Sequence, residues 1–139
     1  MTHLAADEST NLHRLQPLRV LLSGRDRRFV RVTSFLLSRR GYDVALAGPR
    51  NIVEAAAHHR ADVVLLETAD SRVNAARNVA ALQAMPIAPS VLVVFGDGDD
   101  ERWTGLLAVR KWTPVDLLAE AIEDAALRRP APLAESGPL

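Results

Sequence analysis

The stretch LRVLLSGRDRRFVRVTSFLLSRRGYDV, residues 18–44, decides the fold. Its first five residues form a short aliphatic run that is typical of a buried strand. The next residues predict a helix that packs on one side, because those expected to face the core recur with helical spacing, at Phe29, Val32, Thr33, Leu36 and Leu37. Gly41 comes after two arginines, as expected at the end of a helix, and a second strand is predicted over 42–47. The stretch therefore reads as a strand, a helix and a second strand.

The rest of the chain repeats this alternation. Strands are predicted over 62–66, 90–95 and 105–109, and helices over 52–59, 73–82 and 115–125, the last opened by Pro114. Alternating units imply parallel strands joined by right-handed crossovers. We therefore expect a three-layer α/β/α, flavodoxin-like domain with a five-stranded parallel sheet of order 2-1-3-4-5. The segment 96–104 has room for only one helical turn, capped by Asp99 or Asp100, so the fourth helix is shortened.

Composition excludes several classes of protein. The chain has 139 residues, 17 basic and 17 acidic residues and no cysteine. The absence of cysteine excludes a disulfide scaffold and a thiol nucleophile, and zero net charge argues against a nucleic-acid partner. No apolar run approaches the roughly 20 residues of a membrane span, and the N-terminus lacks a signal-peptide pattern. We expect a soluble cytoplasmic protein with no membrane contact.

The organisation of the chain is simple. Residues 1–17 are predicted to be a flexible leader, 18–127 the folded domain, and 128–139, rich in Pro and Ala, a disordered tail. On this reading we expect no output domain such as a helix-turn-helix. The functional site is expected where the carboxyl ends of the strands meet, near the switch point between strands 1 and 3.

Three stretches carry a family resemblance. Residues 18–44 resemble the opening of a response-regulator receiver domain, ADVVLLE (61–67) resembles its third strand, and RKWTPVDLLAEAI (110–122) resembles the entry into its last helix. The resemblance covers about residues 18–127. It implies a receiver-like fold and a role in bacterial two-component signalling.

The phosphorylation site that the resemblance implies has degenerated here. The corresponding crevice contains Gly24, Arg25, Asp26, Glu67, Phe95, Arg110 and Lys111. In active receivers an acidic pair holds Mg²⁺, an aspartate accepts the phosphoryl group, a Ser or Thr binds it and a lysine completes the site. The acidic pair is replaced by Gly24 and Arg25, with an acid only at Asp26, and the acceptor is Glu67.

The remaining site positions are altered as well. Phe95 replaces the Ser or Thr and offers no polar atom. The lysine position falls on Arg110 or, with the register shifted by one, on Lys111, and the switch aromatic falls on Leu107 or Ala108. Because phosphoryl transfer needs metal, positioning and charge neutralisation together, we predict no Mg²⁺-dependent phosphorylation.

The substitutions suggest a fixed ion pair between Glu67 and Arg25, and Arg110 is the second candidate for the neutralising cation. The alternative is that Arg25 points into water. A partner surface is predicted at Trp103, Leu107 and Trp112, although Trp103 could simply fill the gap that the short fourth helix leaves.

Four functions remain open at this point. We expect a non-enzymatic pseudo-receiver, an adaptor that acts through an unidentified protein partner or as a homodimer formed by its last strand and helix. A sensor of a small anionic ligand in the crevice, a residual enzyme and a receiver-like fragment of a longer regulator are the alternatives. No cofactor or metal site is expected, since the acidic run 97–101 lacks the EF-hand spacing, and no nucleotide-binding loop is found.

Overall fold

The computed structural model describes residues 16–68, 72–96 and 106–129. Five strands form one parallel sheet of order β2-β1-β3-β4-β5, which confirms the predicted topology. The strands are β1 (Arg19–Ser23), β2 (Asp43–Ala47), β3 (Val63–Glu67), β4 (Ser90–Phe95) and β5 (Leu107–Arg110). The helices are α2 (Arg27–Arg39), α3 (Ile52–His59), α4 (Arg72–Gln83) and α5 (Val115–Leu127), with a 3₁₀ turn, η1 (Pro49–Asn51), before α3.

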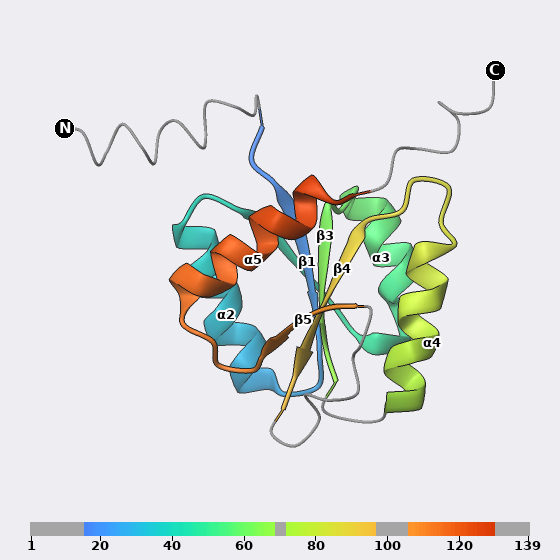
Figure 1. The fold of residues 1–139 in the computed structure, drawn as a ribbon, viewed down its shortest axis with the longest axis horizontal. Helices are drawn as coiled ribbons and strands as arrows, with labels where there is room; N and C mark the ends of the chain where they lie inside the picture. Colours follow the sequence, from blue (N-terminus) through green and yellow to red (C-terminus); the bar gives the residue numbers. More distant parts are fainter. Residues whose placement is uncertain (1–15, 69–71, 97–105, 130–139) are drawn as a thin grey trace.

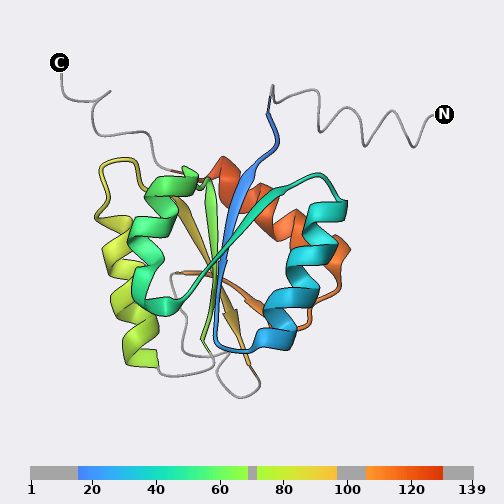
Figure 2. The same cartoon turned by 180° about the vertical axis from the view of Figure 1, so that it is seen from behind.

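Helices cover both faces of the sheet, as expected for a three-layer domain. α2 and α5 lie together on one face, and α3 and α4 lie on the other (Figures 1 and 2). The predicted single turn between β4 and β5, the leader up to residue 15 and the tail from residue 130 lie outside the described residues. Within the described residues, no helix is both long enough and apolar enough to cross a membrane.

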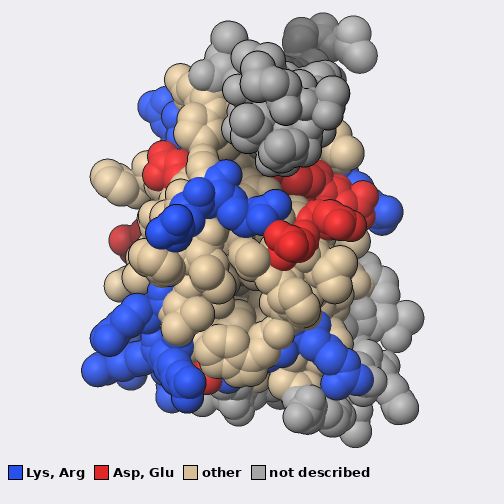
Figure 3. Space-filling model, turned by 90° about the vertical axis from the view of Figure 1, so that its left-hand side faces the viewer, with Lys and Arg blue, Asp and Glu red and all other residues tan. Residues whose placement is uncertain are grey.

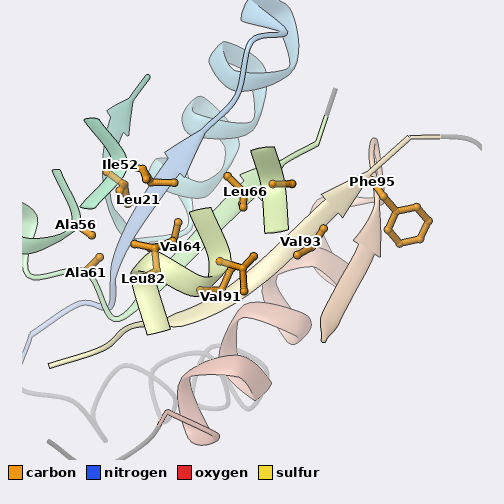
Figure 4. Close-up of a cluster of buried hydrophobic side chains, with 12 residues drawn as sticks. Leu21, Ile52, Ala56, Ala61, Val64, Leu66, Leu82, Val91, Val93 and Phe95 are labelled. Carbon is orange, nitrogen blue, oxygen red and sulfur yellow. The ribbon is translucent and has the colours of Figure 1, made fainter. Parts of the chain in front are cut away.

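Two apolar cores result from the alternation of side chains along the strands. Leu21, Val64 and Val93 point toward α3 and α4, where they meet Ile52 and Leu82 (Figure 4). Their neighbours in sequence point to the other face and pack against α2 and α5; they include Val20, Leu22, Val63, Leu65 and Val94. β3 and β4 are buried along their whole length because helices cover both of their faces.

The last strand differs from its prediction by a shift that matters for the site. β5 pairs with β4 from Leu92–Leu107 to Phe95–Arg110. It therefore ends at Arg110, one residue beyond the predicted end, and Lys111 is the first residue past the sheet edge. Because successive side chains point to opposite faces, this register decides which of the two cations faces α2.

Candidate functional site

The ends of β1, β3 and β5 bring four of the predicted crevice residues together. Gly24 and Asp26 follow β1, Glu67 is the last residue of β3, and Lys111 follows β5. The backbone N–H of Lys111 donates to the carbonyl oxygen of Phe95 over 2.7 Å, which fixes this loop to the end of β4. Residues from three separate segments thus form one polar cluster at the edge of the sheet.

Glu67 is the centre of the cluster. Its side chain is only 1% exposed. One carboxylate oxygen, Oε1, accepts hydrogen bonds from the backbone N–H groups of Arg25, over 3.0 Å, and of Asp26, over 3.2 Å. The other, Oε2, lies 3.1 Å from Nζ of Lys111. A buried carboxylate is costly unless it is paired. Oε1 is paired by two hydrogen bonds, whereas Oε2, a buried atom with no hydrogen-bond partner, is held by the charge of Lys111 alone.

Lys111 supplies the positive charge of the cluster. Its ammonium group forms ion pairs with both Asp26 and Glu67. Burial opposes the charge of Lys111, but hydrogen bonds and Coulomb attraction to the two carboxylates outweigh burial and raise the pKa of Lys111 above its usual value. The cation therefore stays charged at any physiological pH.

Asp26 links the cluster to the first helix. It caps α2, since its Oδ1 accepts a hydrogen bond from the backbone N–H of Phe29 over 3.1 Å. The hydrogen bond from Lys111 and this capping bond hold the pKa of the Asp26 carboxyl below its usual value. Each carboxylate oxygen of Asp26 thus has a partner, since Oδ1 binds the backbone of α2 and Oδ2 pairs with the ammonium of Lys111.

Gly24 makes room for the longer acidic side chain. A Cβ atom added at Gly24 would lie 2.4 Å from Oε1 and 2.7 Å from Cβ of Glu67. Both distances are far inside van der Waals contact, so no larger residue fits while Glu67 keeps its position. The glycine and the glutamate are therefore complementary: the glutamate fills the space that a side chain at position 24 would need.

The predicted ion pair between Glu67 and Arg25 is wrong, because Glu67 pairs with a different cation. Among the described residues, the cation beside Glu67 is Lys111, and Arg25 contributes its backbone N–H instead of its exposed guanidinium. Arg110 lies over the ring of Phe95, 5.9 Å from its centroid. Of the two positions left open for the lysine, the structure places Lys111 in the cluster and Arg110 outside it.

The described residues do not suit a divalent cation. Mg²⁺ needs several oxygen ligands in octahedral geometry, but the ammonium of Lys111 lies between the two carboxylates that could provide them. No group of three or more His, Asp or Glu residues that could hold a metal occurs in the described ranges.

The three residues predicted for a partner surface lie in different settings. Trp112 is half exposed, has a left-handed backbone (φ 66°) and packs edge-on against Phe29, with ring centroids 5.2 Å apart. Leu107 packs against the core under α2 and α5, and Trp103 lies outside the described residues. Phe29 was not predicted as a site residue, although it also lies 5.6 Å from Nζ of Lys111; its helical spacing indicated only core packing.

Comparison with solved structures places this arrangement in a known fold. No protein-family model matches the chain, and a search of curated proteins gives no match. A response regulator receiver domain protein (CheY-like) from Methanospirillum hungatei is 16% identical with a TM-score of 0.68, and the match covers 81% of this chain and 96% of that one. The chain has the fold of a receiver domain.

Two further receiver domains show the same likeness. One from Clostridium thermocellum is 20% identical with a TM-score of 0.65, and the match covers 80% of this chain and 95% of that one. Another, a CheY-like receiver domain from Methylobacillus flagellatus, is 14% identical with a TM-score of 0.68, and the match covers 79% of this chain and 99% of that one. In this receiver-like fold the cluster around Glu67 lies at the carboxyl ends of the strands, where ligands bind in open α/β sheets.

Proposed function

We propose that this chain is a non-enzymatic pseudo-receiver, a signalling adaptor of the bacterial cytoplasm that works through protein contacts and without Mg²⁺-dependent phosphorylation. The receiver-like fold supports the regulatory role. The observation that carries the rest is the state of Glu67, whose two carboxylate oxygens are both held inside the chain.

Phosphorylation would require this arrangement to be taken apart. A phosphoryl donor must reach the acceptor carboxylate, and a metal ion must neutralise the developing charge. Here the acceptor is buried, and Lys111 neutralises it already. Attack of Oε1 or Oε2 on the phosphorus would draw that oxygen away from the N–H groups or the ammonium beside it, and each donor left unpaired would cost about 1–3 kcal/mol.

The cluster also supports one fixed conformation. Lys111 joins the end of β5 to Asp26 at the start of α2 and to Glu67 at the end of β3. Since all three segments are connected at the place where active receivers change state, the domain would present the same surface at all times. Output then depends on which protein is bound and not on a covalent switch.

A sensor of a small anionic ligand is the second candidate, and the geometry favours it less. An anion in the crevice would need the N–H groups of Arg25 and Asp26 or the ammonium of Lys111. Glu67 already uses all three. The carboxylate of the chain itself therefore stands where an anionic ligand would bind.

The proposal is tested with acetyl phosphate and Mg²⁺. The protein is incubated with both, and its intact mass is measured beside an active receiver domain as a positive control. We expect no phosphoryl adduct on the wild type and none on Glu67→Asp, because the aspartate variant still lacks the acidic pair. A stoichiometric adduct on Glu67 would overturn the proposal, whereas an adduct on the aspartate variant alone would show that the length of the acidic side chain, and not the lost metal ligands, blocks the reaction.

A further inference from the structure

We propose that two copies of this chain associate through α2 and α5, with each α2 packed on α5 of the other copy about a two-fold axis that runs along the helices. This dimer rests on the proposed function in one respect, because both require that output passes through a protein contact. It names that partner as a second copy of the chain and locates the contact.

The two helices carry opposite charges. α2 has four arginines, at 27, 28, 31 and 39, and no acidic residue. α5 has four acidic residues, at 116, 120, 123 and 124, and no basic residue. The helices are neighbours on one face of the sheet (Figure 1). This face therefore has a basic half and an acidic half, although the whole chain is neutral.

The outward surface of each helix combines charge with exposed apolar side chains. On α2 an outward stripe consists of Arg28, Arg31, Phe35 and Arg39, spaced by three and four residues. Phe35 is 60% exposed. On α5 the corresponding stripe consists of Leu117, Glu120, Asp124 and Leu127, and its two leucines are 54% and 86% exposed. Figure 3 shows this side of the molecule, with basic side chains at the lower left, a second basic band across the centre and an acidic cluster right of centre that adjoins this band.

Contacts within one copy leave much of this charge unused. Arg40 pairs with Asp116 over 2.7 Å, which joins the two helices where they meet. Asp124 pairs with Arg128 over 3.2 Å. In the described part of the chain no ion-pair partner lies within 4 Å of Arg28, Arg31 or Glu120. These outward charges remain for a partner whose surface has the opposite sign.

Two symmetric arrangements can bring this face of one copy against the same face of a second copy, and the charges favour one of them. Both helices run back from the carboxyl ends of parallel strands, so they point in the same general direction. A two-fold axis across the helices would place α2 on α2 and α5 on α5, with like charges in contact, which is unfavourable. An axis along the helices and between them places α2 on α5 of the other copy twice. Each helix of the resulting four then neighbours only helices of opposite charge.

The apolar side chains fit the same arrangement. Phe35 lies between Arg31 and Arg39 in the stripe, and the guanidinium of Arg39 lies 5.7 Å from its ring centroid. Across the axis it would meet the stripe that holds Leu117 and Leu127. Burial of such a residue at the centre of a contact, inside a rim of charged pairs, is the usual anatomy of a protein interface.

The test uses two charge-reversed proteins and their mixture. Arg28→Glu/Arg31→Glu gives the outward stripe of α2 two acidic residues against one arginine, so that the stripes of both helices are acidic. Glu120→Arg/Asp124→Arg makes the outward stripe of α5 basic, so that both stripes are basic. Sedimentation equilibrium should show a wild-type dimer that weakens with added NaCl. Each reversed protein alone should have a dimer dissociation constant at least about tenfold higher than that of the wild type. Their equimolar mixture should form a heterodimer, because the outward stripe of α2 in each copy again meets an α5 stripe of opposite sign.

The control is Arg50→Glu/Arg77→Glu, which reverses two exposed arginines on the α3 and α4 side of the molecule. It should dimerise like the wild type, and circular dichroism should show all variants folded. A wild type that stays monomeric, a dimer that neither reversal weakens, or a mixture that does not associate would each overturn the proposal. None of these results involves phosphate, so a failure here leaves the acetyl phosphate test standing, and the reverse also holds.

Discussion

Removing the ammonium of Lys111 should destabilise the domain more than any other single change at the sheet edge. Lys111→Met keeps an unbranched side chain that is one atom shorter and deletes the charge that faces Glu67 at 3.1 Å. At an effective dielectric constant of about 20, Coulomb attraction at this distance is about 5 kcal/mol. Removing one partner of a buried pair costs about 3–5 kcal/mol, but Lys111 is 20% exposed and the two backbone N–H bonds to Glu67 remain. We expect a loss of about 2–4 kcal/mol, within the 5–15 kcal/mol that is typical of a domain.

Urea unfolding followed by circular dichroism measures this loss, and Arg110→Met is the matched control. The control removes an adjacent cation that lies over Phe95 outside the cluster, so it should cost less than about 1 kcal/mol. The double variant Lys111→Met/Glu67→Gln should lose less than the sum of the two single variants, because neither buried charge is then left alone. A cost below about 1 kcal/mol for Lys111→Met, or an equal cost for Arg110→Met, would refute the reasoning.

Three further results follow from the same cluster. Gly24→Ala should lower the free energy of unfolding by about 1–3 kcal/mol, since its Cβ would overlap Glu67; a neutral effect in urea would show that Glu67 does not fill that space. Glu67→Ala should be stabilised by added acetate more than the wild type, because a small carboxylate can occupy the vacated N–H groups and the ammonium; equal shifts in Tm would contradict this. Asp26 has a lowered pKa in the folded state. Its contribution to the free energy of unfolding is therefore present above the usual pKa of about 3.9 and is lost as the pH falls through the lowered value. Tm should drop more steeply below about pH 4 in the wild type than in Lys111→Met, and parallel curves would argue against the ion pair.

Hydrophobic periodicity was sufficient for the topology. Short aliphatic runs alternate with helical patterns from Leu18 to Leu127, and parallel strands joined by right-handed crossovers leave few arrangements. Strand ends are less well determined, because an apolar run such as 105–109 does not say which residue pairs with β4. The pairing of Phe95 with Arg110 sets that register.

The candidate site shows where sequence reasoning reached its limit. The positions that follow the strands were identified, since the carboxyl ends of parallel strands lie at one edge. The contacts among them depend on a one-residue register and on side-chain direction, so the cation beside Glu67 is Lys111 and not Arg25. The two backbone N–H donors could not be predicted, because almost any residue at positions 25 and 26 supplies the same N–H group. One signal was available: a glycine opposite a buried glutamate indicates that the longer side chain needs the space.

In the function proposed above, the carboxylate of Glu67 closes the crevice from within. Beryllofluoride with Mg²⁺ mimics a phosphoryl group on an acceptor carboxylate, and amide NMR resonances of Arg25 and Asp26 report directly on the two N–H groups that Glu67 uses. A titration of the wild type should leave both resonances unchanged while an active receiver domain, titrated in parallel, shows saturation. Saturable shifts of the Arg25 and Asp26 amides would contradict the claim, because they would show that the crevice opens to a phosphoryl group.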